Sequence, residues 1–189
     1  ILAPDGKTQL VRAGRGPRHG FSGARSMADG LRRIALRYPA RTGQARDHRP
    51  LPLVRPVDLA LNVAASDNRP LIVTVASDPR QLAVLQQQVQ QLAWTPRFIG
   101  QFIYSSTQRQ AALKPLAGAE PDAAILIVEP GAFGITGKVV AQLTLPTSPA
   151  TMATAFTAAL DAFVPSRKDH NRHIEMGYQL GIEWTTVVP

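Results

Sequence analysis

The sequence contains no cysteine among its 189 residues. This absence excludes disulfide bonds, a thiolate nucleophile, cysteine-ligated zinc and iron–sulfur clusters. It leaves the cellular compartment open, because the chain has no thiol whose state depends on redox conditions. Long apolar runs are also lacking. The longest, residues 123–128, has the length of a β-strand, whereas a membrane-spanning helix needs about 18–20 apolar residues. The sequence therefore predicts no membrane span.

Acidic residues are scarce at one end of the chain. The 21 Lys and Arg exceed the 13 Asp and Glu, for a formal net charge of +8. Residues 1–56 hold twelve of the basic residues and three of the acidic ones, a local charge of +9, and the remainder carries −1. Such a basic surface can bind nucleic-acid phosphates, lipid headgroups or an acidic protein face. The arginines that we predict to bind a partner are Arg12, Arg15, Arg18, Arg32, Arg33 and Arg37.

Aromatic residues make up only 6% of the chain, and Phe21 is the one aromatic side chain within the Arg/Gly-rich stretch 12–25. Base stacking is therefore poorly supported. Two interpretations stay open for residues 12–37: a polyanion- or nucleic-acid-binding surface, and a solvated arm that covers a partner protein.

The pattern divides the chain into three segments. Residues 1–56 form a basic N-terminal extension with a hairpin that turns at residues 4–6, a helix capped by Ser26 and ended by Pro39, and a Pro-rich linker over 40–56. Residues 57–164 have the regular apolar pattern of a folded domain, and residues 165–189 form an apolar tail. Residues 1–39 also have the same hairpin–helix–proline order as residues 125–165. They are the end of a preceding similar domain, a permuted supplement to this one, or an unrelated hairpin and helix.

Residues 57–164 predict a mixed α/β fold. Leu71–Ala76 reads as a buried strand, Asp78 as the N-cap of the next helix, and Pro79 as its first residue. We expect further strands at 98–104, 123–128 and 139–145. We expect helices at 57–65, 79–94, 106–116 and 149–164, the last one capped by Ser148.

Two segments, together with this order of elements, resemble the thioredoxin superfamily. They are Asn68-Arg69-Pro70-Leu71-Ile72-Val73 after an Ala-rich helix and Glu120-Pro121-Asp122-Ala123-Ala124-Ile125-Leu126. The resemblance is to exported, thioredoxin_7-type domains. It implies a mixed central sheet flanked by helices, a cis peptide bond before Pro121, and slightly favours an exported or periplasmic location.

The resemblance departs from the family at its reactive site. Thioredoxin-type domains carry a Cys-x-x-Cys pair where the first strand runs into a helix, and this chain has Asp78-Pro79-Arg80-Gln81 there. The resemblance therefore implies a redox-inactive domain. Asp78 is expected to act as a helix cap, although a helix N-terminus beside Arg80 also suits an anion.

No other group of residues predicts catalysis. Ser105, Ser106 and Thr107 have no histidine near them in sequence to serve as a base. His170 and His173 have a spacing that suits a metal, but basic residues surround them. Gly131–Lys138 has the wrong spacing for a phosphate-binding loop and reads as a hairpin turn. We expect no enzymatic activity, no cofactor and no metal.

The C-terminal segment 165–189 is rich in apolar residues. Apolar residues alternate along 177–184, which predicts an extended segment whose apolar face is buried against residues 57–164 or against another subunit. The residues of that face are Tyr178, Leu180, Ile182 and Trp184. The sequence thus favours a redox-inactive thioredoxin-like interaction module, an accessory or structural subunit of a larger protein assembly. The alternative is a polyanion or nucleic-acid binder.

Overall fold

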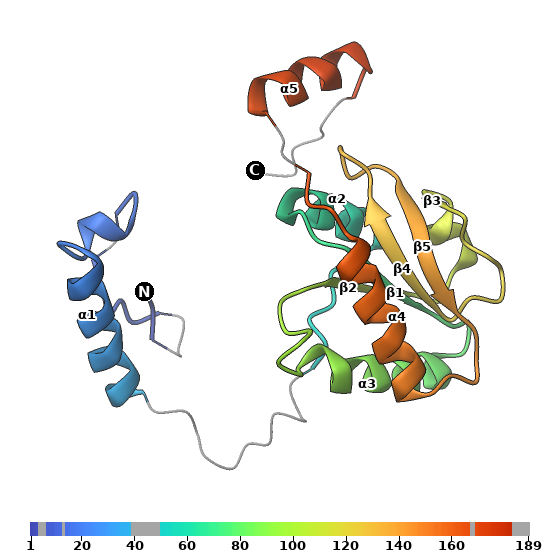
Figure 1. The fold of residues 1–189 in the computed structure, drawn as a ribbon, viewed down its shortest axis with the longest axis horizontal. Helices are drawn as coiled ribbons and strands as arrows, with labels where there is room; N and C mark the ends of the chain where they lie inside the picture. The colour runs from blue at the N-terminus through green and yellow to red at the C-terminus, as the bar shows by residue number, and fades with distance from the viewer. Residues whose placement is uncertain (4–6, 13, 39–49, 167–168, 183–189) are drawn as a thin grey trace. The chain divides into compact units, whose positions relative to one another are not determined.

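The computed structural model describes residues 1–3, 7–12, 14–38, 50–166 and 169–182. The chain divides into two compact units, Ile1–Ala45 and Arg46–Pro189. Figure 1 shows both, and each is described by itself.

The first unit is a short hairpin and a helix. Leu2 and Gln9 form an antiparallel bridge, and the backbone N–H of Ala3 donates to the carbonyl of Thr8 at 2.8 Å. The predicted hairpin pairing is confirmed, whereas its turn lies outside the described residues. Helix α1 spans Ala24–Arg37, with Gly23 and not Ser26 as its N-cap. The helix begins earlier than predicted, and Phe21 packs over Gly30 in its middle, where an added Cβ would lie 2.5 Å from the ring.

The second unit is a mixed α/β fold built on a five-stranded sheet. The strands are β1 (Leu71–Val75), β2 (Ile103–Thr107), β3 (Leu116–Ala117), β4 (Ile125–Pro130) and β5 (Gly137–Leu143). Their order is β2-β1-β4-β5-β3. The pairs β1–β2 and β3–β5 are parallel, and β1–β4 and β4–β5 are antiparallel.

Helices cover both faces of this sheet (Figure 1). On one face lie α3 (Pro79–Ala93) and α4 (Pro149–Ala162), which bury Leu85 and Phe156 against Ile72 and Ile127. On the other face lies α2 (Val57–Asp67), whose Leu61 packs with Val73 and Leu126. All five residues of β1 are buried because the strand is covered on both sides. The apolar strand and the amphipathic helices confirm the predicted α/β class.

Local caps begin two of the helices where the sequence predicts them. The Asp78 carboxylate accepts from the backbone N–H groups of Arg80 and Gln81, at 3.1 and 3.3 Å, and Pro79 occupies the first position of α3. The Ser148 hydroxyl accepts from the Thr151 N–H at 3.0 Å at the start of α4. Both caps satisfy N–H groups that have no partner within the helix.

The region from 98 to 117 differs from the prediction. The strand lies at 103–107 and not at 98–104, because the Phe98 and Phe102 rings turn into the core beside Phe156. The helix expected over 106–116 is a 3₁₀ turn, η3 (Gln110–Leu113). β2 continues in register with β1 through Thr107, and Pro115 then limits any helix that follows.

The prediction of a cis bond before Pro121 is wrong. The cis peptide bonds of the described residues are Arg55–Pro56 and Leu145–Pro146. The N–H of Ala123 donates to the carbonyl of Glu120 at 3.3 Å, which places Pro121 at the second position of a β-turn, where a trans proline fits. The strand β4 begins only at Ile125.

The predicted extended tail is also wrong for its first half. Residues 170–179 form helix α5 (His170–Gln179), whose N-cap is Asp169, which accepts from the Arg172 N–H at 2.9 Å. His173 and Gly177, one helical turn apart, contact Phe133, and the His173 and Phe133 rings stack with centroids 4.3 Å apart. This contact requires the spacing of a helix. The alternation of apolar residues over 178–184 predicted an extended segment instead.

Candidate functional site

The carboxyl ends of the parallel strands β1 and β2 carry the candidate site. This is the end of a parallel strand pair at which α/β proteins commonly bind ligands. β1 runs here into the Asp78-Pro79 start of α3. The Asp78 carboxylate takes the N–H groups that an external anion would otherwise bind, so the interpretation of Asp78 as a cap is confirmed.

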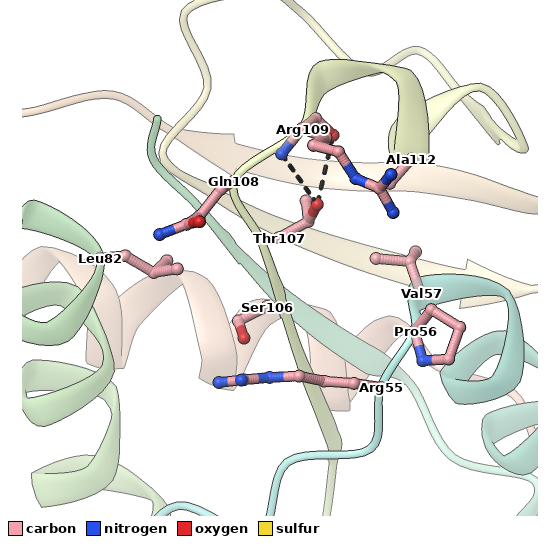
Figure 2. A pocket seen from close by; sticks show the side chains of 9 residues that line it. All are labelled: Arg55, Pro56, Val57, Leu82, Ser106, Thr107, Gln108, Arg109 and Ala112. Carbon is pink, nitrogen blue, oxygen red and sulfur yellow. Dashed lines mark hydrogen bonds between the residues drawn. The ribbon is translucent and has the colours of Figure 1, made fainter. Parts of the chain in front are cut away.

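Two hollows flank the end of β2, and Gln108 lines both. The first, of about 460 Å³, lies beside the β1–α3 junction and is lined among others by Ser77, Gln81, Asp122 and Thr144. The second, of about 540 Å³, lies at the outer edge of β2 and is shown in Figure 2. Both volumes are in the range of small-molecule sites, about 300–1,000 Å³.

The hollow at the edge of β2 has a distinctive lining. Its apolar side chains are Pro56, Val57, Leu82 and Ala112, and its neutral polar side chains are Ser106, Thr107 and Gln108. Arg55 and Arg109 add two positive charges, and no carboxylate or histidine belongs to this lining. Both arginine side chains are exposed, and neither forms an ion pair with any described residue.

Hydrogen bonds fix the walls of this hollow. The Val54 N–H donates to the Tyr104 carbonyl at 2.8 Å, and the Ser105 hydroxyl donates to the Val54 carbonyl at 2.7 Å. These two bonds hold residues 51–55 along β2, so that Arg55 lies below Ser106 in Figure 2. On the other side, the Thr107 hydroxyl accepts from the Arg109 N–H at 3.0 Å and donates to the Arg109 carbonyl at 3.2 Å. Arg109 is thus positioned through its own backbone, and Arg55 through the backbone of its neighbour Val54.

Ser106 is the unusual residue of the site. It is only 6% exposed, and its Oγ has no hydrogen-bond partner. Tyr104, on the same strand, is 3% exposed and likewise has an unpartnered hydroxyl. Burial raises the pKa of the Tyr104 phenol above its ordinary value. The difference between them is that Ser106 lines an open hollow, whereas Tyr104 belongs to the hydrophobic core.

The predicted basic surface is exposed. All six predicted arginines, from Arg12 to Arg37, are exposed. Among these six, only Arg32 forms an ion pair with a described residue, Asp29 at 2.8 Å. A hollow of about 340 Å³ in the same unit is lined by Phe21, Gly30, Arg33 and Arg37, among others. The structure places Arg33 and Arg37 together there, on one side of α1.

Two of the predicted tail residues are not buried within their own chain. Tyr178 is 80% and Leu180 64% exposed. The version of the prediction in which Tyr178 packs against residues 57–164 is therefore wrong, because its position on α5 points away from the Phe133 contact. Ile182 is partly buried, and Trp184 lies outside the described residues. Burial against another subunit stays a prediction.

No three metal-ligating side chains cluster within the described residues. Among their helices, none is long and apolar enough to cross a membrane. The Gly131–Lys138 segment joins β4 to β5 and is closed by a 2.7 Å bond from the Gly131 N–H to the Thr136 carbonyl, which confirms the predicted hairpin turn.

Sequence reasoning missed Arg55 and Arg109 as members of a site and considered Ser106 only as a nucleophile. A signal was present in Ser105-Ser106-Thr107, a run of hydroxyl side chains directly after the apolar residues 102–104. Such residues need partners, and the search for those partners leads to the hollow. Comparison with known proteins adds no further assignment: no protein-family model, no curated protein and no solved structure matches this chain.

Proposed function

We propose that this protein is a redox-inactive, thioredoxin-like interaction module that serves as an accessory subunit of a larger protein assembly. The observation that carries the proposal is the β1–α3 junction. There Asp78 caps the helix with its own carboxylate, at the place where a thioredoxin-type domain holds its first reactive cysteine. A mixed central sheet with helices on both faces is compatible with the thioredoxin-like part.

Exposed apolar side chains support the interaction part. Along the last helix and its end, Ile174, Met176, Tyr178 and Leu180 are each at least 43% exposed. Apolar side chains gathered in one short segment favour a contact with another protein. The packing of His173 and Gly177 on Phe133 leaves these side chains free for such a contact.

A second candidate function rests on the basic first unit. Exposed arginines such as Arg33 and Arg37, which have no carboxylate partner among the described residues, favour a polyanion or nucleic acid as the ligand of residues 12–37. The two functions differ in their dependence on salt. Binding to phosphates releases the counterions of the nucleic acid, so added salt weakens it steeply, whereas apolar docking does not weaken in this way.

Native mass measurement tests the proposal. The full chain is recovered from cells under mild conditions, and the mass of its assembly is followed from about 50 to about 500 mM salt. We expect an assembly that persists at high salt and that Tyr178→Ser with Leu180→Ser disrupts. Because both side chains are exposed, this double variant should keep the thermal stability of the isolated chain. Leu36→Ser, at an 82% exposed position in the first unit, is the control and should leave the assembly intact.

Two outcomes contradict the protein-partner function. Dissociation at moderate salt with release of nucleic acid, abolished by Arg33→Gln with Arg37→Gln, would establish the polyanion function in its place. A chain that is monomeric at low salt and carries no nucleic acid would contradict both.

A further inference from the structure

We infer that the hollow at the outer edge of β2 binds a small organic molecule bearing an oxyanion, a carboxylate or a phosphate, through Arg55, Arg109 and the Ser106 hydroxyl. This inference does not rest on the thioredoxin-like proposal, which concerns the β1–α3 junction and the surface of α5.

The first argument is the state of Ser106. A serine that is 94% removed from solvent normally has its hydroxyl hydrogen-bonded, because an unpaired buried hydroxyl is destabilising. Its neighbour Ser105 follows this rule, with Val54 as its acceptor at 2.7 Å. The Ser106 Oγ has no partner among the described residues and lines the hollow, so its hydroxyl is available to a ligand.

The second argument is the sign of the charge. Arg55 and Arg109 line the hollow without any carboxylate in its lining, and neither guanidinium forms a salt bridge within the part of the chain that the structure describes. An arginine side chain only donates hydrogen bonds, and a planar guanidinium matches the two oxygens of a carboxylate or phosphate. Figure 2 shows Arg55 beside Ser106 and Arg109 beside Thr107, at the two ends of the short strand segment 106–107.

The backbone adds a weaker positive electrostatic potential at the hollow. Val57, the first residue of α2, lines the hollow, and the N-cap of this helix, Pro56, has no side chain that could bond to the free N–H groups. The positive end of the helix dipole therefore faces the same region. Asp58 in the first turn of α2 offsets part of this potential, although it does not line the hollow.

The third argument is shape. Leu82 from α3 and Val57 from α2, both buried, provide apolar walls on either side of the polar groups. A volume of about 540 Å³ suits a small metabolite with an apolar body and one anionic group. It is too small for a stretch of polyanion, which distinguishes this site from the exposed arginines of α1.

The test is an NMR titration of the full chain with phenyl phosphate, with benzoate, and with the neutral benzamide. We expect saturable shifts at residues 55–57 and 106–109 with at least one of the two anions and none with benzamide. The anion that binds with the higher affinity shows whether the site prefers a phosphate or a carboxylate group. Arg55→Gln and Arg109→Gln should each weaken binding by about tenfold, as expected for a lost charge-assisted pair.

Two controls separate this site from general effects. Arg69→Gln removes the same charge from an exposed position outside the hollow and should leave binding unchanged. Ser106→Ala should weaken binding while the melting temperature does not fall, because the hydroxyl has no partner within the protein to lose. Equal binding of benzamide, equal weakening by Arg69→Gln, or no saturable shift with either anion would each overturn the inference.

Discussion

The hydroxyl group of Ser105 donates a hydrogen bond of 2.7 Å to the carbonyl oxygen of Val54. This bond joins the segment before α2 to the edge strand β2, next to the backbone bond from Val54 to Tyr104. Ser106, the next residue, points to the other face of the sheet, and its hydroxyl has no partner. Two adjacent buried serines thus have opposite roles: one holds the wall of the hollow and the other faces into it.

The two serines should respond differently to the same substitution. Ser105→Ala leaves the Val54 carbonyl without its side-chain donor and should lower the free energy of unfolding by about 1–2 kcal/mol. Ser106→Ala loses no bond within the protein and should change it by less than about 0.5 kcal/mol. Urea unfolding of both variants and the wild type measures this difference. Equal losses would show that the Ser106 hydroxyl is paired inside the protein.

Tyr104 should make stability depend on alkaline pH. Burial raises the pKa of its phenol in the folded state, whereas the unfolded chain ionises near the ordinary value of about 10. Above that pH the unfolded state binds fewer protons than the folded state, so stability is full below about pH 10 and falls as the pH rises toward the folded pKa. The decrease can reach about 1.4 kcal/mol per pH unit.

Phenylalanine substitutions isolate this effect. Tyr104→Phe should reduce the loss of stability between about pH 9 and pH 11 and cost little at neutral pH, because the hydroxyl has no partner. Tyr178→Phe, at an 80% exposed position, should leave the alkaline profile as it is in the wild type. Urea midpoints measured across this pH range provide the comparison, and identical profiles for the two variants would contradict the assignment to Tyr104.

Gly134 should tolerate no side chain. It has a φ of +66° in the β4–β5 turn, and an added Cβ would lie 2.6 Å from the Cα of Asn62 in α2. Gly100 has a similar φ of +71° and open space around it. Gly100→Ala should therefore cost about 1 kcal/mol, from backbone conformation alone, and Gly134→Ala should cost at least about 2 kcal/mol more. Thermal unfolding of the pair tests whether the β4–β5 turn packs on α2 as described.

The sequence predicts the core better than the site because local signals determine the core elements. The Asp78-Pro79 cap, the Ser148 cap and the apolar run of β1 each specify an element through neighbours in the chain. The strand at 103–107 lies later than predicted because its buried Ser105 and Ser106 lack the apolar pattern of a buried strand. The partners of Ser105 lie far away in sequence, Val54 for its hydroxyl and Thr74 for its carbonyl. Long-range pairing cannot be read from a local pattern.

The tail differs from its sequence-based prediction for another reason. Alternating apolar residues over 178–184 have the period of a strand, yet α5 forms because His173 and Gly177 meet Phe133 across a turn that follows β4. The candidate site was missed for the same reason. Arg55, Ser106 and Arg109 come from the segment before α2, the end of β2 and the loop after it, and only the folded chain brings them together.

The most direct test of the central claim introduces the missing thiols. Asp78→Cys with Gln81→Cys creates a Cys-x-x-Cys sequence at the β1–α3 junction, the first thiol at the N-cap and the second in the first turn. If this junction is a thioredoxin-type junction without its chemistry, the double variant should form an internal disulfide. The thiol at position 78 should have a pKa lowered to about 7 or below by the helix N-terminus. Its reduced form should then reduce insulin disulfides, as the wild type cannot. A double variant that folds, yet keeps an ordinary thiol pKa near 8.5 and shows no disulfide exchange, would contradict the thioredoxin-like proposal.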